Sequence, residues 1–129
     1  MTSVFIIEND PTLQELYEKI LENNGFQVVG KVSSGIDAIA QYQLFSIKPD
    51  VVIMDYRMPM KNGVETTKEI LEIDNNARII IISGDLTVED EVLKQGAKKF
   101  LKKPFSYHQL VSEIDKLSNT MYDVPKIAS

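Results

Sequence analysis

Residues 51–59 read Val-Val-Ile-Met-Asp-Tyr-Arg-Met-Pro, an apolar run followed by a carboxylate and a proline-containing segment. Its four leading apolar residues predict a buried strand at 51–54, and Asp55 follows where the backbone leaves the sheet. In parallel α/β sheets, ligands bind at this edge, beyond the carboxyl ends of the strands. A carboxylate is costly to bury unless its charge is used. Asp55 is therefore the first candidate functional residue.

Four further apolar segments predict the remaining strands, at 4–7, 27–32, 78–82 and 99–102. Apolar residues at helical spacing predict helices at 11–24, 36–44, 64–73 and 87–95, and a fifth helix that Ser106 caps. Asp10-Pro11 suits the start of the first helix, because Asp10 can cap it. Strands that alternate with helices predict an α/β fold with a doubly wound parallel sheet. For five strands the common order is 2-1-3-4-5, a flavodoxin-like sheet.

Polar residues also end three of the other predicted strands. Strand order 2-1-3-4-5 makes the first and third strands neighbours, so Glu8 and Asn9 are expected beside Asp55. Crowded carboxylates need a cation, and hard oxygen ligands favour Mg²⁺. An aspartate can also act as the nucleophile in phosphoryl transfer. In that reaction Asp55 would attack, and Lys103 and Ser83 would each hold a phosphoryl oxygen.

Composition narrows the functional classes. The chain has 129 residues, a net charge of −5 and no cysteine. The length suits one domain, predicted at residues 1–120, with a tail or the start of a linker at 121–129. The acidic balance argues against nucleic acid as a direct partner. The absence of a long apolar run argues against a membrane span, and the N-terminus lacks a signal-peptide pattern, so a cytoplasmic protein is expected.

Four motifs in chain order resemble those of receiver domains in two-component response regulators, especially the chemotaxis regulators. They are Glu8-Asn9-Asp10-Pro11, the block Asp55, Met58-Pro59 and Gly63, Ser83-Gly84, and Lys103-Pro104-Phe105. The resemblance covers residues 3 to about 119. It implies that Asp55 is the phosphoacceptor and that a histidine kinase or phosphotransfer protein is the donor. It also implies Mg²⁺ as cofactor, held by Glu8, Asn9, Asp55 and the backbone carbonyl of Arg57.

The same resemblance implies how the domain works. Ser83 and Lys103 would contact the phosphoryl oxygens, and the peptide bond between Lys103 and Pro104 would be cis. Ser83 and Phe100 would be switch residues, and Phe100 would act through packing alone because it lacks the tyrosine hydroxyl frequent at that position. The face formed by the fourth helix, fifth strand and fifth helix would bind a downstream protein effector. Such a domain is a signalling switch with no separate turnover substrate, although it promotes its own phosphorylation and dephosphorylation.

Two features of this sequence are not fixed by the resemblance. Asn9 stands where the family usually has a carboxylate, so weaker Mg²⁺ binding is expected. Arg57 and Asp85 each lie two residues beyond a site residue, and a pair between them would shield the phosphoryl group and tune its lifetime. The alternative, two exposed and unpaired charges, is favoured because surface ion pairs stabilise little.

Three other functions stay open at this point. A degenerate receiver would bind partners without phosphorylation, and Asn9 keeps that interpretation open. An aspartate-nucleophile phosphatase would need a second acid where Arg57 stands. A flavin carrier of similar topology would need glycine or hydroxyl donors in the first turn, which is acidic here. Five lysines in the last third (Lys94, Lys98, Lys99, Lys102 and Lys103) indicate an acidic patch on the partner of a signalling switch.

Overall fold

The computed structural model describes residues 1–121. Of the predicted tail at 121–129, only residue 121 lies within this range. The described residues form one parallel sheet of five strands in the order β2-β1-β3-β4-β5, as predicted. The strands are β1 (Ser3–Ile7), β2 (Gln27–Val32), β3 (Val51–Asp55), β4 (Ile79–Ser83) and β5 (Lys99–Lys102). Because all five run in one direction, their carboxyl ends meet at one edge of the sheet.

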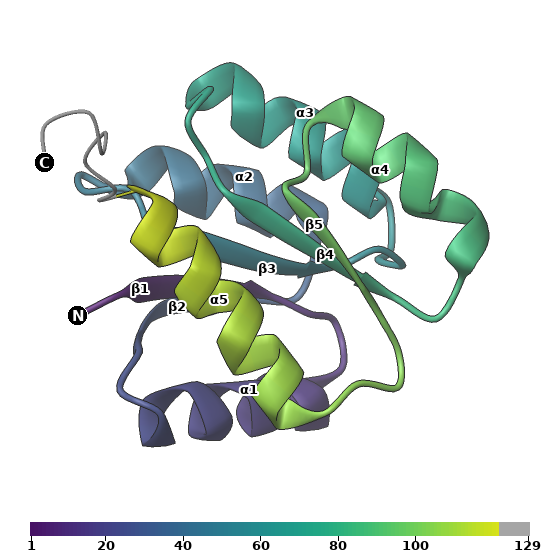
Figure 1. Cartoon of the computed structure of the whole chain (residues 1–129). Coiled ribbons are helices and arrows are strands. Elements are labelled where there is room, and N and C mark those ends of the chain that lie inside the picture. The colour runs from purple at the N-terminus through teal and green to yellow at the C-terminus, as the bar shows by residue number, and fades with distance from the viewer. Residues whose placement is uncertain (122–129) are drawn as a thin grey trace, which may run out of the picture.

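Helices cover both faces of the sheet (Figure 1). Helices α1 (Pro11–Asn23) and α5 (Tyr107–Met121) pack on one face, and α2 (Gly35–Leu44), α3 (Gly63–Ile73) and α4 (Glu89–Gln95) pack on the other. Every residue of β3 and β4 is buried, which explains why the first four residues of each strand are continuously apolar rather than alternating. None of the helices in residues 1–121 has the length and apolar character that a membrane crossing requires.

Two helices, α1 and α3, begin with side-chain caps near the edge of the sheet where the carboxyl ends of the strands meet. The Asp10 carboxylate accepts hydrogen bonds from the backbone N–H groups of Thr12 at 2.9 Å and Leu13 at 3.5 Å, so Asp10 caps α1 as expected. At the start of α3, Asn62 and Glu65 form a capping box, each bonding the other's backbone N–H. This box begins α3 at Gly63, one residue earlier than the apolar spacing predicted.

The fourth helix differs from the prediction. The expected helix at 87–95 is a short 3₁₀ turn, η1 (Leu86–Val88), followed by α4 from Glu89. The Asp85 carboxylate accepts hydrogen bonds from the backbone N–H of Thr87 at 2.9 Å and from its hydroxyl at 2.6 Å. Such local side-chain bonds compete with the regular helix. Asp85 therefore holds the segment that follows β4, next to the carboxyl ends of the strands.

Candidate functional site

The carboxyl ends of four strands bring together the side chains that the motifs singled out. Lys103 Nζ lies 3.6 Å from Asp55 Oδ1 and 3.9 Å from Glu8 Oε1. Ser83 closes the end of β4, the strand paired with β3. Asp55, Ser83 and Lys103 line a surface hollow of about 360 Å³, together with Arg57, Gly84 and Asp85. The expected convergence of distant segments on one pocket is therefore present in the fold.

Two carboxylates beside Lys103 are buried: Glu8 is 2% exposed and Asp55 is 9% exposed. Burial raises the pKa of Asp55, and the Lys103 ammonium partly offsets that increase. Burial likewise raises the pKa of Glu8, and the charge on Asp55 raises it further. The site therefore holds more negative charge than one lysine compensates, which favours binding of an additional cation.

The oxygen atoms present fit a hard cation. Glu8 Oε2 accepts a hydrogen bond from the Asp10 backbone N–H at 3.1 Å. Its second oxygen, Oε1, is buried and has no hydrogen-bond partner among the described residues. A buried carboxylate oxygen without a partner is costly, and Mg²⁺ prefers such oxygens as ligands.

The charge available to that cation is limited. Asn9 follows Glu8 as an exposed residue and offers an uncharged amide oxygen. Residues 1–121 contain no group of three acidic, histidine or cysteine side chains placed to hold a metal. Glu8 and Asp55 are thus the two buried carboxylates beside Lys103. The Asp85 carboxylate in the hollow is engaged by Thr87 and Arg57, and the Asp10 carboxylate is a helix cap.

Arg57 and Asp85 both line the hollow and form an ion pair. Arg57 Nη2 lies 3.5 Å from Asp85 Oδ2. The favoured sequence interpretation, two unpaired charges, is therefore wrong. Because the two hydrogen bonds from Thr87 already fix the Asp85 carboxylate, forming the pair costs mainly the ordering of Arg57. The same bonds, more than Arg57, lower the pKa of Asp85.

Ser83 is engaged in the structure. Its hydroxyl oxygen accepts a hydrogen bond from the Asp85 backbone N–H at 3.0 Å. The hydroxyl proton is left available as a donor toward the hollow. Ser83 and Asp85 therefore connect the floor of the hollow to the segment that leads into α4.

Lys103 is followed directly by a loop that packs against α1. The peptide bond between Lys103 and Pro104 is cis. Next to it, Phe105 stacks on Tyr17 of α1, with ring centroids 6.3 Å apart and planes 23° apart. Tyr17 is buried, and its pKa is raised by burial and by the Glu8 and Asp55 charges. Its helical spacing predicted only a core residue, so the sequence carried no signal for this position beside the site.

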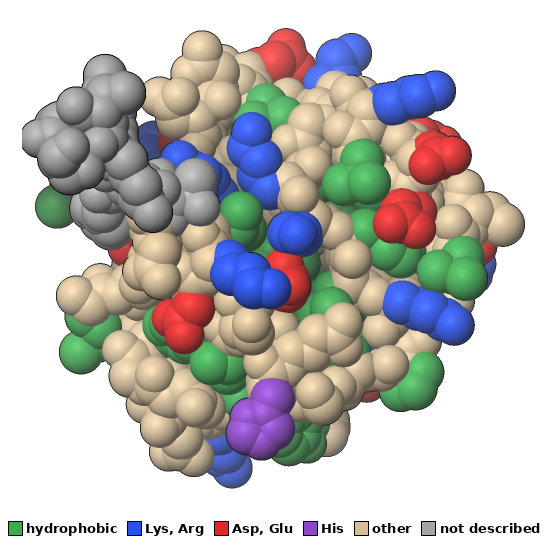
Figure 2. Space-filling view, in the orientation of Figure 1, with side chains coloured by type: hydrophobic (Ala, Val, Ile, Leu, Met, Phe, Trp, Pro, Cys, Tyr) green, Lys and Arg blue, Asp and Glu red, His purple; other side chains and the backbone are tan. Residues whose placement is uncertain are grey.

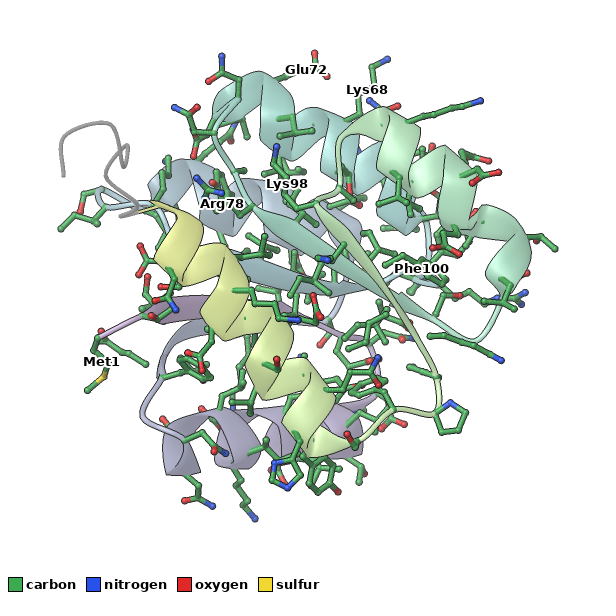
Figure 3. All side chains as sticks on the ribbon, viewed as in Figure 1. Met1, Lys68, Glu72, Arg78, Lys98 and Phe100 are labelled. Carbon is green, nitrogen blue, oxygen red and sulfur yellow. The ribbon has the colours of Figure 1, made fainter. Side chains whose placement is uncertain are left out.

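Phe100 is half-buried and packs in the hydrophobic cluster that includes Val92 of α4. In Figure 3 it lies beside β5 on the side of α4. The position therefore belongs to the same hydrophobic cluster as the helix that follows Ser83 and Asp85.

The comparison with known families agrees with this geometry. Residues 4–115 match the family model of the response regulator receiver domain. The chain belongs to the receiver domain family. This receiver domain is 36% identical over 117 residues to the chemotaxis protein CheY of Thermotoga maritima, covering 89% of this chain and 96% of that protein.

Two solved structures are similar to this receiver domain. One is the complex of CheX with CheY, BeF3 and magnesium from Borrelia burgdorferi, with a TM-score of 0.84, 26% identity, and coverage of 90% of this chain and 88% of that chain. The other is the receiver domain of a sensor histidine kinase from Pseudomonas aeruginosa PAO1, which holds magnesium in its active-site cleft. That structure has a TM-score of 0.81 and 26% identity, and covers 92% of this chain and 98% of its own.

Proposed function

We propose that this receiver domain accepts a phosphoryl group on Asp55 from the phosphohistidine of a histidine kinase or phosphotransfer protein. One observation carries the proposal: a nearly buried Asp55 carboxylate lines an open hollow with the Lys103 ammonium 3.6 Å away. The carboxylate is reachable, its negative charge is incompletely compensated, and a donor for phosphoryl oxygens stands beside it. The domain is a signalling module, not an enzyme with its own turnover substrate.

In the proposed transfer, an Asp55 oxygen forms a bond to phosphorus while the bond from phosphorus to the donor's imidazole nitrogen breaks. Lys103 neutralises one phosphoryl oxygen, and the Ser83 hydroxyl donates to another. Glu8, Asn9, Asp55 and the Arg57 backbone carbonyl would hold Mg²⁺. When bound, Mg²⁺ supplies positive charge to the phosphoryl oxygens and to the two buried carboxylates.

The output of the switch begins at Ser83. To donate to a phosphoryl oxygen, the Ser83 side chain would move toward it, and this movement would disturb the hydrogen bond that the Ser83 hydroxyl accepts from the Asp85 backbone N–H. Asp85 also holds η1 through Thr87, so this movement would act on the segment before α4. Phe100 packs in the cluster with α4 and would change its packing with it. Phosphorylation thereby shifts the population between two packed states of the face formed by α4, β5 and α5.

The chemistry of this face supports an acidic effector. Figure 2 shows several basic side chains gathered over β5 and α5. Lys94, Lys98 and Lys102 are exposed and make no ion pair in the part of the chain that the structure describes. Complementary charge accelerates association and excludes partners of the same sign. We therefore expect the effector to present a carboxylate-rich patch.

The Arg57–Asp85 pair supports a role in the lifetime of the phosphoryl group. Both residues line the hollow that Asp55 lines, so the pair would hinder a water molecule approaching the phosphorus from this side. Arg57 also adds positive charge next to the position of the phosphoryl oxygens. We propose that the pair slows hydrolysis of phospho-Asp55.

Incubation with acetyl phosphate and Mg²⁺, followed by intact-protein mass measurement, tests the central proposal. The wild-type protein should gain one phosphoryl group, and an Asp55→Asn variant should gain none. The uncharged Asn9 favours a second candidate, a degenerate receiver that binds partners without phosphorylation. Absence of a mass gain in the folded wild-type protein would favour that candidate and contradict the phosphoacceptor role.

A further inference from the structure

Gln14, in the second turn of α1, makes a set of hydrogen bonds that the function described above does not include. Its side-chain nitrogen Nε2 donates to the backbone carbonyl oxygens of Glu8 and Val32, each at 2.9 Å. The same nitrogen lies 3.4 Å from the Ser33 hydroxyl oxygen. An amide NH₂ group has two protons, so the two short bonds to the carbonyls account for both. Gln14 is half-buried.

These bonds join the ends of two strands to a helix. The Glu8 backbone N–H also donates to the Val32 carbonyl at 3.0 Å. Glu8 directly follows β1, and Val32 is the last residue of β2, which pairs only with β1 in the described sheet. Gln14 therefore fixes the backbone of Glu8 at the point where the chain turns from β1 toward α1.

The Glu8 side chain depends on that backbone position. Its Oε1 is the buried carboxylate oxygen without a hydrogen-bond partner, and it faces Lys103 Nζ at 3.9 Å. Its other oxygen is held by the Asp10 backbone N–H. A shift of the Glu8 backbone would move Oε1 relative to the Asp55 carboxylate, and a cation shared by the two would lose its geometry.

We propose that Gln14 is a positioning residue for the cation site: it holds the Glu8 backbone so that the Glu8 and Asp55 carboxylates converge on one Mg²⁺. The inference rests on the proposed function, since it assumes that Mg²⁺ binds between these carboxylates. Gln14 touches neither the cation nor the phosphoryl group, and its effect passes through Glu8.

The test removes the amide donors and leaves a good helix former in place. Gln14→Met keeps the length of the side chain, and Gln14→Ala is a second variant that suits a helix. Groups that hydrogen-bond to metal-ligating residues typically raise the affinity of the protein for the metal by about tenfold or more. Since the Asp10 bond to Glu8 remains, we expect the lower end, a weakening of Mg²⁺ binding by about tenfold. Gln43→Met is the matched control, because Gln43 is exposed on α2.

The measurement is a titration of the full chain with MgCl₂ at a temperature where each variant is folded. Binding is monitored through the NMR chemical shifts of the backbone amides. The unfolding free energy without metal is measured alongside. Weaker binding in both Gln14 variants, with Gln43→Met equal to wild type, is the expected result. Wild-type affinity in either folded Gln14 variant would overturn the inference. So would equal weakening in the control, or failure of both Gln14 variants to fold, which would make the residue a general fold stabiliser.

Failure of the proposed function looks different in the same experiment. If wild type showed no saturable Mg²⁺ binding, the cation site itself would be absent and the role of Gln14 would fall with it. If wild type binds and the Gln14 variants bind equally well, the cation site stands and only the role of Gln14 is lost.

Discussion

Replacing Lys103 by Met should destabilise the metal-free protein in a way that depends on pH. Lys103 Nζ lies 3.6 Å from Asp55 Oδ1 and 3.9 Å from Glu8 Oε1. At these distances each attraction is about 1 kcal/mol in water and about 4 kcal/mol at an effective dielectric constant of about 20. Because the Lys103 side chain is 33% exposed, solvent screens much of this energy. We expect a net loss of about 2 kcal/mol near pH 8.

The pH dependence follows from the two carboxylates. Burial raises the pKa of Asp55 and of Glu8, and Lys103 opposes that increase in both. The stabilisation that Lys103 provides requires ionised carboxylates. It is therefore fully present well above their folded pKa values and is lost as the pH falls through them. Near pH 4.5, closer to these raised pKa values, a larger fraction of both carboxylates is protonated than near pH 8, so the loss should be smaller than near pH 8.

Urea unfolding of wild type and Lys103→Met at both pH values, without divalent cations, measures these differences. Lys102→Met is the matched control, since Lys102 is exposed and forms no ion pair within the described residues. It should change the unfolding free energy by less than about 0.5 kcal/mol at either pH. An equal loss for Lys103→Met at both pH values, or no loss near pH 8, would refute the electrostatic reasoning.

Three further predictions concern the cation, the phosphoryl group and the packing of α4. Asn9→Asp should tighten Mg²⁺ binding severalfold in calorimetric titration, because it adds a carboxylate beside Glu8; unchanged affinity would contradict this. Arg57→Ala should accelerate loss of phosphate from phospho-Asp55 severalfold, as followed by intact mass, and an unaltered rate would reject the shield. Gly96→Ala should cost about 2 kcal/mol, because Gly96 has a φ of +123° and an added Cβ would lie 2.5 Å from Leu71 Cδ1. Gly25→Ala, with a φ of +85° and open space around it, should cost only about 1 kcal/mol; equal costs for the two would show that α3 and α4 are not packed tightly there.

Much of the fold could be predicted because its strands are short, apolar and buried on both faces. The ranges 27–32 and 99–102 agree with β2 and β5, and the strand order follows from right-handed crossovers between parallel strands. The errors lie at the boundaries of helices, because side-chain hydrogen bonds determine the residue at which each helix begins. The capping box of Asn62 and Glu65 starts α3 one residue early, and Asp85 turns the first part of the expected fourth helix into η1.

The sequence alone indicates which residues stand at the carboxyl ends of the strands, because apolar runs and the residues that end them are local patterns. It thereby placed Glu8, Asp55, Ser83 and Lys103 at one edge of the sheet. Which atoms meet there depends on the three-dimensional fold: the Arg57–Asp85 pair, the Glu8 Oε1 that has no hydrogen-bond partner among the described residues, and the Gln14 amide on two strand ends. These depend on side-chain direction and on distances between segments far apart in the chain, and no spacing along the sequence specifies either.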